Sequence, residues 1–211
     1  MKKRLPLILI LIGILLLILP WAPLIKDEVW YALKGREEEP KKFSAFAKSA
    51  FAQYLFDKPT AYNPVNKDFA LVIEKIGVNV PVIKDVYVSD ESAYKESLEH
   101  GVAHAASSGY PSRDPGNVYI FAHASLNFWQ LGKYSTVFNL LRKLDTGDII
   151  HVFYQGQDYV YVVMNKDSVK GWDTFPLERT VIEPVLTLQT CDPPGTTLNR
   201  LIITAKLLDV L

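Results

Sequence analysis

The sequence predicts an all-β domain, built as a barrel or a sandwich, that follows one N-terminal transmembrane helix. About eight short apolar, β-branched runs lie between residues 69 and 205 with turn signals between them, and helical patterns there are few and short. A long uncharged segment precedes them at residues 5–25. The length of 211 residues suits one globular domain with such an appendage.

Composition narrows the class of protein. The chain carries 23 basic and 23 acidic side chains, which argues against a nucleic-acid partner, because nucleic-acid binders show a basic excess. Its single cysteine excludes an intrachain disulfide and a Cys₄ or Cys₂His₂ zinc site. Its 49% of hydrophobic residues excludes a disordered chain.

Residues 1–25 predict a basic cytoplasmic start and a membrane anchor. The run Leu5–Ile25 is long enough to cross a bilayer as a helix, and the basic residues 2–4 favour a cytoplasmic N-terminus. A cleaved signal peptide is the alternative, but Pro20–Pro23 lacks the small-residue cleavage pattern. In both cases the domain is exported, so we expect a single-pass plasma-membrane protein whose folded domain lies outside.

Residues 26–66 predict a spacer. Arg36–Pro40 is charged and ends in a helix breaker, whereas Phe43–Leu55 repeats apolar residues at the i, i+3, i+4 spacing of an amphipathic helix. We favour a helix that packs against its own domain over one that lies on the membrane surface, because a surface helix usually has a more basic polar face.

Within residues 67–211 each apolar run predicts one element. The predicted strands lie at 69–73, 78–83, 86–88, 117–122, 149–153, 159–164, 185–190 and 201–205. Glu91–Leu98 predicts a short helix capped by Ser89 or Asp90, and apolar spacing predicts a second helix over Thr136–Leu144. Asn165–Pro184 predicts a long loop, and loops of that length are often functional.

Cys191 directly follows a predicted strand. The turn residues 192–195 end that strand, so the thiol is expected to face a loop where a ligand can reach it. A buried, inert cysteine is the alternative, since free cysteines are among the most buried residues. Taken alone, the residue leaves both interpretations open.

Two further polar residues stand at strand ends. A cysteine nucleophile needs a proton acceptor, and His123 follows a predicted strand as Cys191 does, while His104 among small residues is a second candidate. Arg200 opens the last strand, so a short loop would return it to Cys191, where a guanidinium can stabilise charge on a carbonyl oxygen. A packing histidine and an ordinary surface arginine are the alternatives.

The stretch Thr187–Cys191 resembles the TLxTC signature of sortases, which are membrane-anchored cysteine transpeptidases of bacterial surfaces. Other segments are similar to that family in the same order: Phe69–Val78, Gly101–His104, Pro115–Val118, Ala122–His123, Leu140–Asp148 and Leu201–Ala205. Glu74 replaces a usual proline, and Ala124-Ser125 follows the histidine where many members carry arginine, so the resemblance assigns no subclass.

The resemblance implies a closed eight-stranded barrel and a role for each matched residue. Cys191 is the implied nucleophile, His123 its acid/base partner, and Arg200 the group that positions the substrate and stabilises the oxyanion. Thr190 matches a position that lines the site, and His104 matches a position that is often histidine, so both are expected to contact substrate. Trp172 lies in the implied recognition loop and suggests an apolar peptide groove.

The implied reaction is a pair of acyl transfers. The cysteine cleaves an LPxTG-like sorting signal of a surface protein, and an amine from a cell-wall peptide or a pilin lysine resolves the thioester. This chemistry requires no cofactor; some members bind calcium near the long loop, so Glu178 and Glu183 leave calcium as an alternative. The Asp-Pro-aromatic lid motif of some pilus-building members does not occur before residue 67, so we expect an open site.

Other classes of function stay open from the sequence. A membrane-tethered cysteine protease would use the same Cys/His pair, and a non-catalytic β-barrel interaction module would keep the fold around an inert thiol. The joint presence of Cys191, His123 and Arg200 argues against the interaction module. The His-Gly-Cys arrangement of L,D-transpeptidases is missing.

Overall fold

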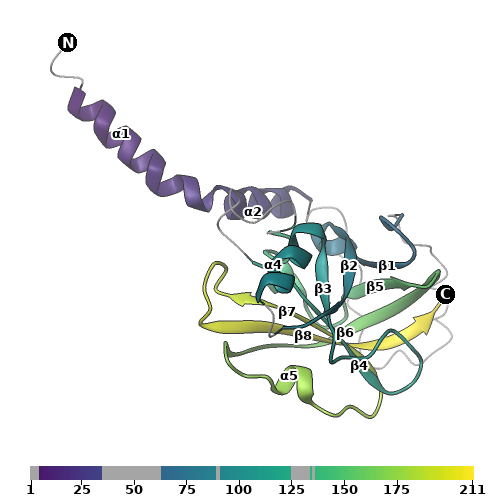
Figure 1. Ribbon diagram of the computed structural model, residues 1–211. Helices are drawn as coiled ribbons and strands as arrows, with labels where there is room; N and C mark the ends of the chain where they lie inside the picture. The colour runs from purple at the N-terminus through teal and green to yellow at the C-terminus, as the bar shows by residue number, and fades with distance from the viewer. Residues whose placement is uncertain (1–4, 35–62, 89–90, 125–133, 135) are drawn as a thin grey trace.

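The computed structural model describes residues 5–34, 63–88, 91–124, 134 and 136–211. In these residues eight strands form a closed barrel in the order β1-β2-β3-β4-β7-β8-β6-β5, the architecture that the family resemblance implied (Figure 1). The charged spacer at 36–40, the amphipathic helix at 43–55 and the cap at 89 or 90 fall outside the described residues, so those expectations stay predictions.

The first four strands are neighbours in the barrel in their chain order, whereas β4 is followed around the barrel by β7, β8, β6 and β5. The eight strands are β1 (Phe69–Ile73), β2 (Val78–Val86), β3 (Val102–Ala105), β4 (Gly116–Phe121), β5 (Ile149–Tyr154), β6 (Gln157–Lys170), β7 (Pro184–Asp192) and β8 (Asn199–Val210). The pairs β2–β3 and β4–β7 are parallel, and the other neighbours are antiparallel. The parallel β4–β7 pair matters most, because it aligns the ends of two strands that are far apart in sequence.

The barrel interior is a single packed core. Leu71, Ile120, Leu188 and Ile203 come from four different strands and are fully buried, and Tyr161 is the largest of the fully buried side chains. Burying such aliphatic and aromatic side chains contributes about 1.5–3 kcal/mol each. The strands are therefore a rigid support for whatever their ends carry.

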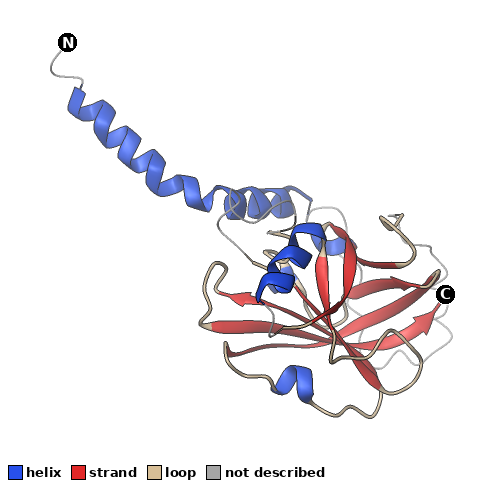
Figure 2. Cartoon of the chain, viewed as in Figure 1, coloured by secondary structure: helices blue, strands red, loops and turns tan. Residues whose placement is uncertain are grey.

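Short helices lie outside the barrel (Figure 2). Helix α4 (Glu91–His100) packs on β2 and β3, and α5 (Phe175–Glu178) lies between β6 and β7 in the chain. Two of the 3₁₀ turns lie between elements of the barrel domain: η2 (Glu74–Ile76) and η3 (Leu141–Lys143). Of these elements, α4 and the turn before α5 contribute to the site described below.

The N-terminal segment is broken rather than continuous. Helix α1 (Leu5–Ile18) is followed by the 3₁₀ turn η1 (Leu19–Trp21) and by α2 (Ala22–Lys34). The uninterrupted helix predicted over 5–25 is thus corrected, because Pro20 has no N–H to continue the helical ladder. No single described helix combines the length and apolarity of a membrane crossing; Leu9–Ile18 and Ala22–Lys34 meet that test only as a pair, bent by 66°.

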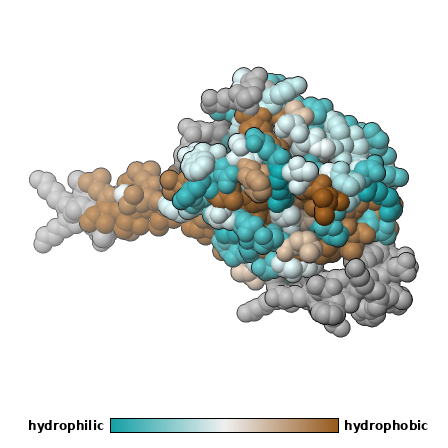
Figure 3. Space-filling model, turned by 90° about the horizontal axis from the view of Figure 1, so that it is seen from below, coloured by the Kyte–Doolittle hydropathy of each residue, from teal (hydrophilic) through white to brown (hydrophobic). Residues whose placement is uncertain are grey.

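Helices α1 and α2 have different surroundings. Figure 3 shows α1 as an apolar rod that projects from the body of the molecule. Helix α2 instead contacts the barrel: the ring of Trp30 lies so close to Gly77 that an added Cβ would be 2.4 Å from it. Glu28 of α2 pairs with Arg142 and, at 3.0 Å, with Lys143. These contacts fix α2 against the residues around η2 and η3.

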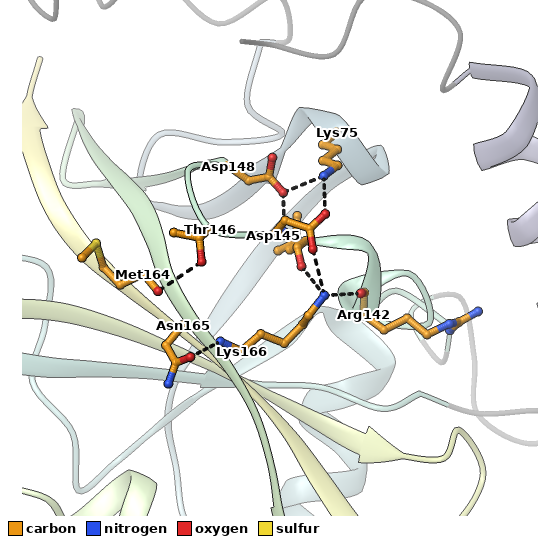
Figure 4. A network of polar contacts seen from close by, with 9 residues as sticks. Lys75, Arg142, Asp145, Thr146, Asp148, Met164, Asn165 and Lys166 are labelled. Atoms are coloured by element: carbon orange, nitrogen blue, oxygen red, sulfur yellow. Dashed lines mark hydrogen bonds and ion pairs between the residues drawn. The ribbon is translucent and has the colours of Figure 1, made fainter. Parts of the chain in front are cut away.

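Paired charges join η2, the residues before β5 and strand β6 in what we call the basal ion-pair network: Lys75, Asp145, Asp148 and Lys166 (Figure 4). Lys75 Nζ donates to Asp148 at 2.8 Å, and Lys166 Nζ donates to Asp145 at 3.1 Å and to the Leu144 carbonyl at 2.7 Å. Asp148 also accepts from the Asp145 N–H at 2.6 Å. Each charged group in this network has an opposite charge as partner.

Three sequence predictions change in detail. Residues 136–144 form turns and the short η3 rather than an α-helix, and Val86 continues β2 instead of opening a separate strand. The predicted loop 165–184 begins as strand, since β6 pairs with β8 as far as Lys170. Side chains 164–168 are exposed there, so no apolar alternation marked this part of the strand. The four-residue strand β3 was not among the strands predicted from the sequence.

Candidate active site

Strand register brings the three predicted catalytic residues to one end of the barrel. Cys191 in β7 and Arg200 in β8 are directly paired across antiparallel strands. Strands β4 and β7 run parallel with Phe121 opposite Gln189, and the Ala122 N–H donates to the Gln189 carbonyl at 3.1 Å. His123 follows Phe121 by two residues, as Cys191 follows Gln189, so the histidine and the cysteine lie side by side.

These side chains open into one cavity of about 740 Å³. Cys191, His123 and Arg200 all line it, and so does Trp172 from the turn after β6. A volume of this size fits a peptide segment or a drug-sized ligand. The thiol is half-buried, so it is accessible from the cavity without being fully exposed.

His123 has an imidazole nitrogen available for chemistry. Its Nε2 is buried and has no hydrogen-bond partner within the described part of the chain. Burial lowers the pKa of His123, and the nearby positive charge of Lys95 lowers it further. The ring is therefore mainly neutral near pH 7 and can accept a proton from a thiol or donate one when charged.

Arg200 carries a charge with no acidic partner. Its guanidinium donates to the Asn199 carbonyl at 3.2 Å, and no described carboxylate forms an ion pair with it. A half-buried guanidinium of this kind can hold a substrate oxygen as negative charge develops there. Direct pairing with Cys191 across the strands puts that charge next to the thiol.

The loops at the rim of the cavity are tied together by their backbones. The Gly195 N–H donates to the Ala124 carbonyl at 2.7 Å, which joins the β7–β8 loop to the segment after β4. The Gly171 N–H donates to the Leu198 carbonyl at 2.9 Å. A Cβ at Gly171 would lie 2.1 Å from the Thr197 carbonyl oxygen, so glycine is required for this close approach. Trp172, which follows, is 83% exposed at the cavity mouth.

Two predicted substrate contacts are corrected. His104 is fully buried in β3, its Nε2 lies 3.0 Å from the Gly109 carbonyl oxygen, and its ring stacks on Tyr110. Thr190 is also buried, and its hydroxyl donates to the Ala122 carbonyl at 2.9 Å. Neither side chain lines the cavity. Thr190 instead ties the end of β7 to the end of β4, next to His123.

Several cavity residues were missed from the sequence, and three of them bear on the site: Tyr119, Gln189 and Tyr94. Tyr119 and Gln189 line the wall, and the Tyr119 hydroxyl donates to the Gln189 side chain. Both stand at even spacing from His123 or Cys191 along their strands, so strand alternation could have identified them. The third, Tyr94 on α4, had no such signal, because a helix contributes it from another part of the chain.

The described residues hold no group of three or more His, Cys, Asp or Glu side chains that could bind a metal ion. Glu183, one of the two carboxylates considered for calcium, pairs with Lys206, and Glu178 is exposed. Nothing in the described chain therefore favours the calcium alternative. The expectation of an open site concerns residues that include the undescribed stretch 35–62, and it stays a prediction.

Comparisons with known proteins agree with this geometry. A family model described as Sortase domain matches residues 71–208, and no curated protein sequence matches the chain. The solved structures it resembles include sortase C-1 from Actinomyces oris, at 23% identity and a TM-score of 0.57 over 89% of this chain and 99% of that one. The sortase D5 transpeptidase of Clostridium perfringens is 22% identical, with a TM-score of 0.54 over 74% of this chain and 86% of that one.

The sortase C1 of GBS Pilus Island 1 is 21% identical, with a TM-score of 0.56 over 67% of this chain. This chain spans 64% of the length of that protein. At such identities the structural likeness establishes the fold alone. The family model, which covers well over half of the chain, carries the information about family.

Proposed function

This chain belongs to the sortase family of cysteine transpeptidases, and we propose that it cleaves an LPxTG-like sorting signal and transfers the new acyl group to an amine. The observation that carries the proposal is the strand register, which pairs Cys191 with Arg200 and pairs Gln189, two residues before Cys191, with Phe121, two residues before His123. Three chemically complementary groups thereby share one cavity. Cys191, His123 and Arg200 each have one role in the two steps of the proposed reaction.

The first step is acylation of the cysteine. Neutral His123 takes the proton of the Cys191 thiol, the resulting thiolate attacks the carbonyl carbon of the scissile peptide bond, and the oxyanion that forms is stabilised by the Arg200 guanidinium. The C–N bond then breaks, and protonated His123 gives its proton to the leaving amine. The products are a thioester on Cys191 and the released C-terminal fragment, with His123 neutral.

The second step is aminolysis. Neutral His123 accepts a proton from the incoming amine as the amine nitrogen attacks the thioester carbonyl. Collapse of the tetrahedral intermediate breaks the C–S bond, forms the new amide and returns the thiolate and the imidazolium. Water in place of the amine would give a free acid, which is the outcome that a membrane-tethered protease would produce.

The cavity wall supports an apolar peptide as substrate. Trp172 and Leu177 lie on one side, and Tyr119 and Phe121 contribute aromatic surface from β4. Apolar walls with a few polar groups at the reacting end are typical of sites that hold a peptide in one orientation. The leucine and proline of an LPxTG-like signal fit such a wall, and the scissile carbonyl then falls near Arg200.

We place the enzyme as a single-pass protein of the plasma membrane, with a cytoplasmic N-terminus and an exported barrel. The apolar character of α1 and the basic residues 2–4 support this orientation. Its partners would be surface proteins that end in the sorting signal and an amine acceptor, a cell-wall peptide or a pilin lysine. The proposed chemistry requires no cofactor.

The amine dependence of product formation tests this proposal. The full chain in detergent micelles is incubated with a pool of randomised LPxTG-like peptides, with and without a small amine, beside Cys191→Ala and His123→Ala. Amide product that forms only with amine, and only with intact Cys191, supports transpeptidation. Free-acid product unaffected by the amine would favour the protease, and no product with an unreactive thiol would favour the interaction module.

A further inference from the structure

Tyr94 forms a wall beside the reactive histidine. Its ring stacks on Phe121 with centroids 5.4 Å apart and an interplanar angle of 6°, and it meets the His123 ring at 5.4 Å and 88°. Tyr94, Phe121 and His123 all line the catalytic cavity. One tyrosine from α4 thus contacts both the end of β4 and the imidazole two residues beyond it.

Within the described part of the chain, no polar group supports the reactive histidine. In Cys–His and Ser–His sites a third group commonly hydrogen-bonds the imidazole and fixes its orientation. No described residue hydrogen-bonds to His123, and its buried Nε2 has no partner. His123 also lies two residues beyond the end of β4, so the ladder pairing of that strand does not continue to it. Among the described residues, the His123 ring is therefore held by packing.

Tyr94 is anchored well enough to provide that packing. The Phe121 ring beneath it is buried in the barrel core, and α4 itself packs on β2 and β3. Two aromatic rings in fixed positions restrict the rotation of a third that touches one of them edge to face. The perpendicular contact therefore restrains the imidazole plane while leaving its nitrogens unoccupied.

The electrostatic environment agrees with this placement. Burial raises the pKa of Tyr94 to about 12, and the negative charge of Cys191 acts in the same direction while Arg200 opposes it. Tyr94 thus lies within electrostatic reach of both polar members of the site. Its hydroxyl stays protonated at neutral pH, so Tyr94 adds no charge to the cavity.

We propose that Tyr94 is a positioning residue for the transpeptidation: its ring holds the His123 imidazole in the plane that lets it exchange a proton with Cys191 and the substrate amine. This inference rests on the proposed function, in which His123 is the proton carrier. The ring is the acting part of Tyr94, and the hydroxyl is secondary.

The test compares three variants of the full chain in detergent. Tyr94→Leu removes the ring, Tyr94→Phe removes only the hydroxyl, and Tyr154→Leu is a matched control. Tyr154 also packs partly buried against the core, next to Phe69, but it does not line the cavity. Each variant is assayed for kcat and KM of amide formation, for thermal unfolding, and for the rate at which iodoacetamide alkylates Cys191 between pH 5 and 9.

We expect Tyr94→Leu to lower kcat by roughly 10- to 100-fold with little change in KM, because a misplaced proton carrier slows the chemical steps. Hydration of the freed imidazole should also move the acid limb of the alkylation profile to higher pH, because burial no longer lowers the pKa of His123 as much. Tyr94→Phe should recover most of the lost kcat and the original limb. Tyr154→Leu should lower only the unfolding temperature.

The proposal is overturned if Tyr94→Leu keeps the wild-type kcat and alkylation profile, or if Tyr94→Phe loses as much as Tyr94→Leu. If Tyr94→Leu does not fold, the Tyr94→Phe result alone decides. The alkylation profile requires no peptide. A profile that shifts as expected in an enzyme that processes no LPxTG-like peptide would therefore support the role of Tyr94 while contradicting the proposed substrate.

Discussion

Two regions of the molecule, the basal ion-pair network and the catalytic cavity, treat polar groups in opposite ways. In the basal ion-pair network each charged side chain has an opposite charge within 3.5 Å (Figure 4). In the catalytic cavity, His123 has a buried nitrogen without a partner among the described residues, and Arg200 has no described carboxylate beside it. Leaving buried polar groups unpaired costs stability. The groups that pair contribute to the fold, and the groups that do not are free to act on a substrate.

We therefore expect substitutions in the two regions to affect different properties of the protein. Changes in the catalytic cavity should lower turnover with little loss of stability, because those side chains make few bonds that the fold requires. Changes in the basal network should lower stability and leave turnover alone. The four predictions below test this separation, beginning with the largest expected effect.

Replacing Cys191 should abolish the reaction and spare the fold. Cys191→Ala is expected to lower amide formation by roughly 10⁴-fold or more, because no other nucleophile stands at that position. The unfolding temperature should stay within a few degrees of wild type, since the thiol is only half-buried. Product mass spectrometry and thermal unfolding measure the two effects; residual activity above one per cent would assign the nucleophile elsewhere.

Replacing Arg200 should cost about 10²- to 10³-fold in kcat, the effect of removing one oxyanion donor. Arg200→Lys keeps the charge but loses the planar fork of donors, so it should recover only a small part of the loss. Steady-state kinetics of both Arg200→Gln and Arg200→Lys check this. Full recovery of kcat by Arg200→Lys would mean that this position supplies a positive charge alone and that the planar geometry of the guanidinium is not needed.

Breaking the basal network should give the opposite result. Asp148→Ala leaves Lys75 and the Asp145 N–H without their shared acceptor, and we expect a loss of about 1–3 kcal/mol in the free energy of unfolding. Denaturant titration measures this, and kcat should stay within a factor of two. A fall in kcat as large as that of Arg200→Gln would show that the network and the catalytic cavity are coupled.

The acid limb of the pH profile should respond to Lys95. The pKa of His123 is lowered by burial and by the Lys95 charge, so the acid limb of kcat/KM should lie below pH 6.5. Lys95→Gln removes the repulsion that disfavours the imidazolium, raises that pKa, and should move the limb to higher pH by less than one unit. The pH dependence of the wild type and the variant decides; a shift to lower pH would contradict this placement of charges.

The sequence could predict that the three functional residues stand at strand ends, but it could not predict which other residues surround them. Cys191 and His123 each follow an apolar run, and Arg200 opens one, so their place at strand ends needed only local pattern. The short loop between their strands also predicted that Arg200 returns to Cys191. That His123 joins them came from the family resemblance, since the parallel β4–β7 pairing joins strands that no local turn connects. The contacts of a helix residue such as Tyr94 depend on how α4 packs on the barrel, and short-range sequence patterns do not predict that packing.

Local pattern also misled in two places. His104 sits among small residues, which suggested an accessible site, yet β3 is a barrel strand whose four residues are all buried, and its histidine is fully buried. The exposed residues 164–168 looked like loop, yet their backbone pairs with β8. In both cases the partner strand, rather than the side chain, decided the outcome.

The most direct test of the central claim is the intact mass of the full chain after rapid quenching with an LPxTG-like peptide and no amine. The account predicts an added acyl mass that maps to Cys191, is absent from Cys191→Ala, and disappears when a small amine is supplied, with amide product released. An acyl mass that persists on Cys191→Ala would contradict it. So would the absence of any adduct while iodoacetamide alkylates Cys191 normally.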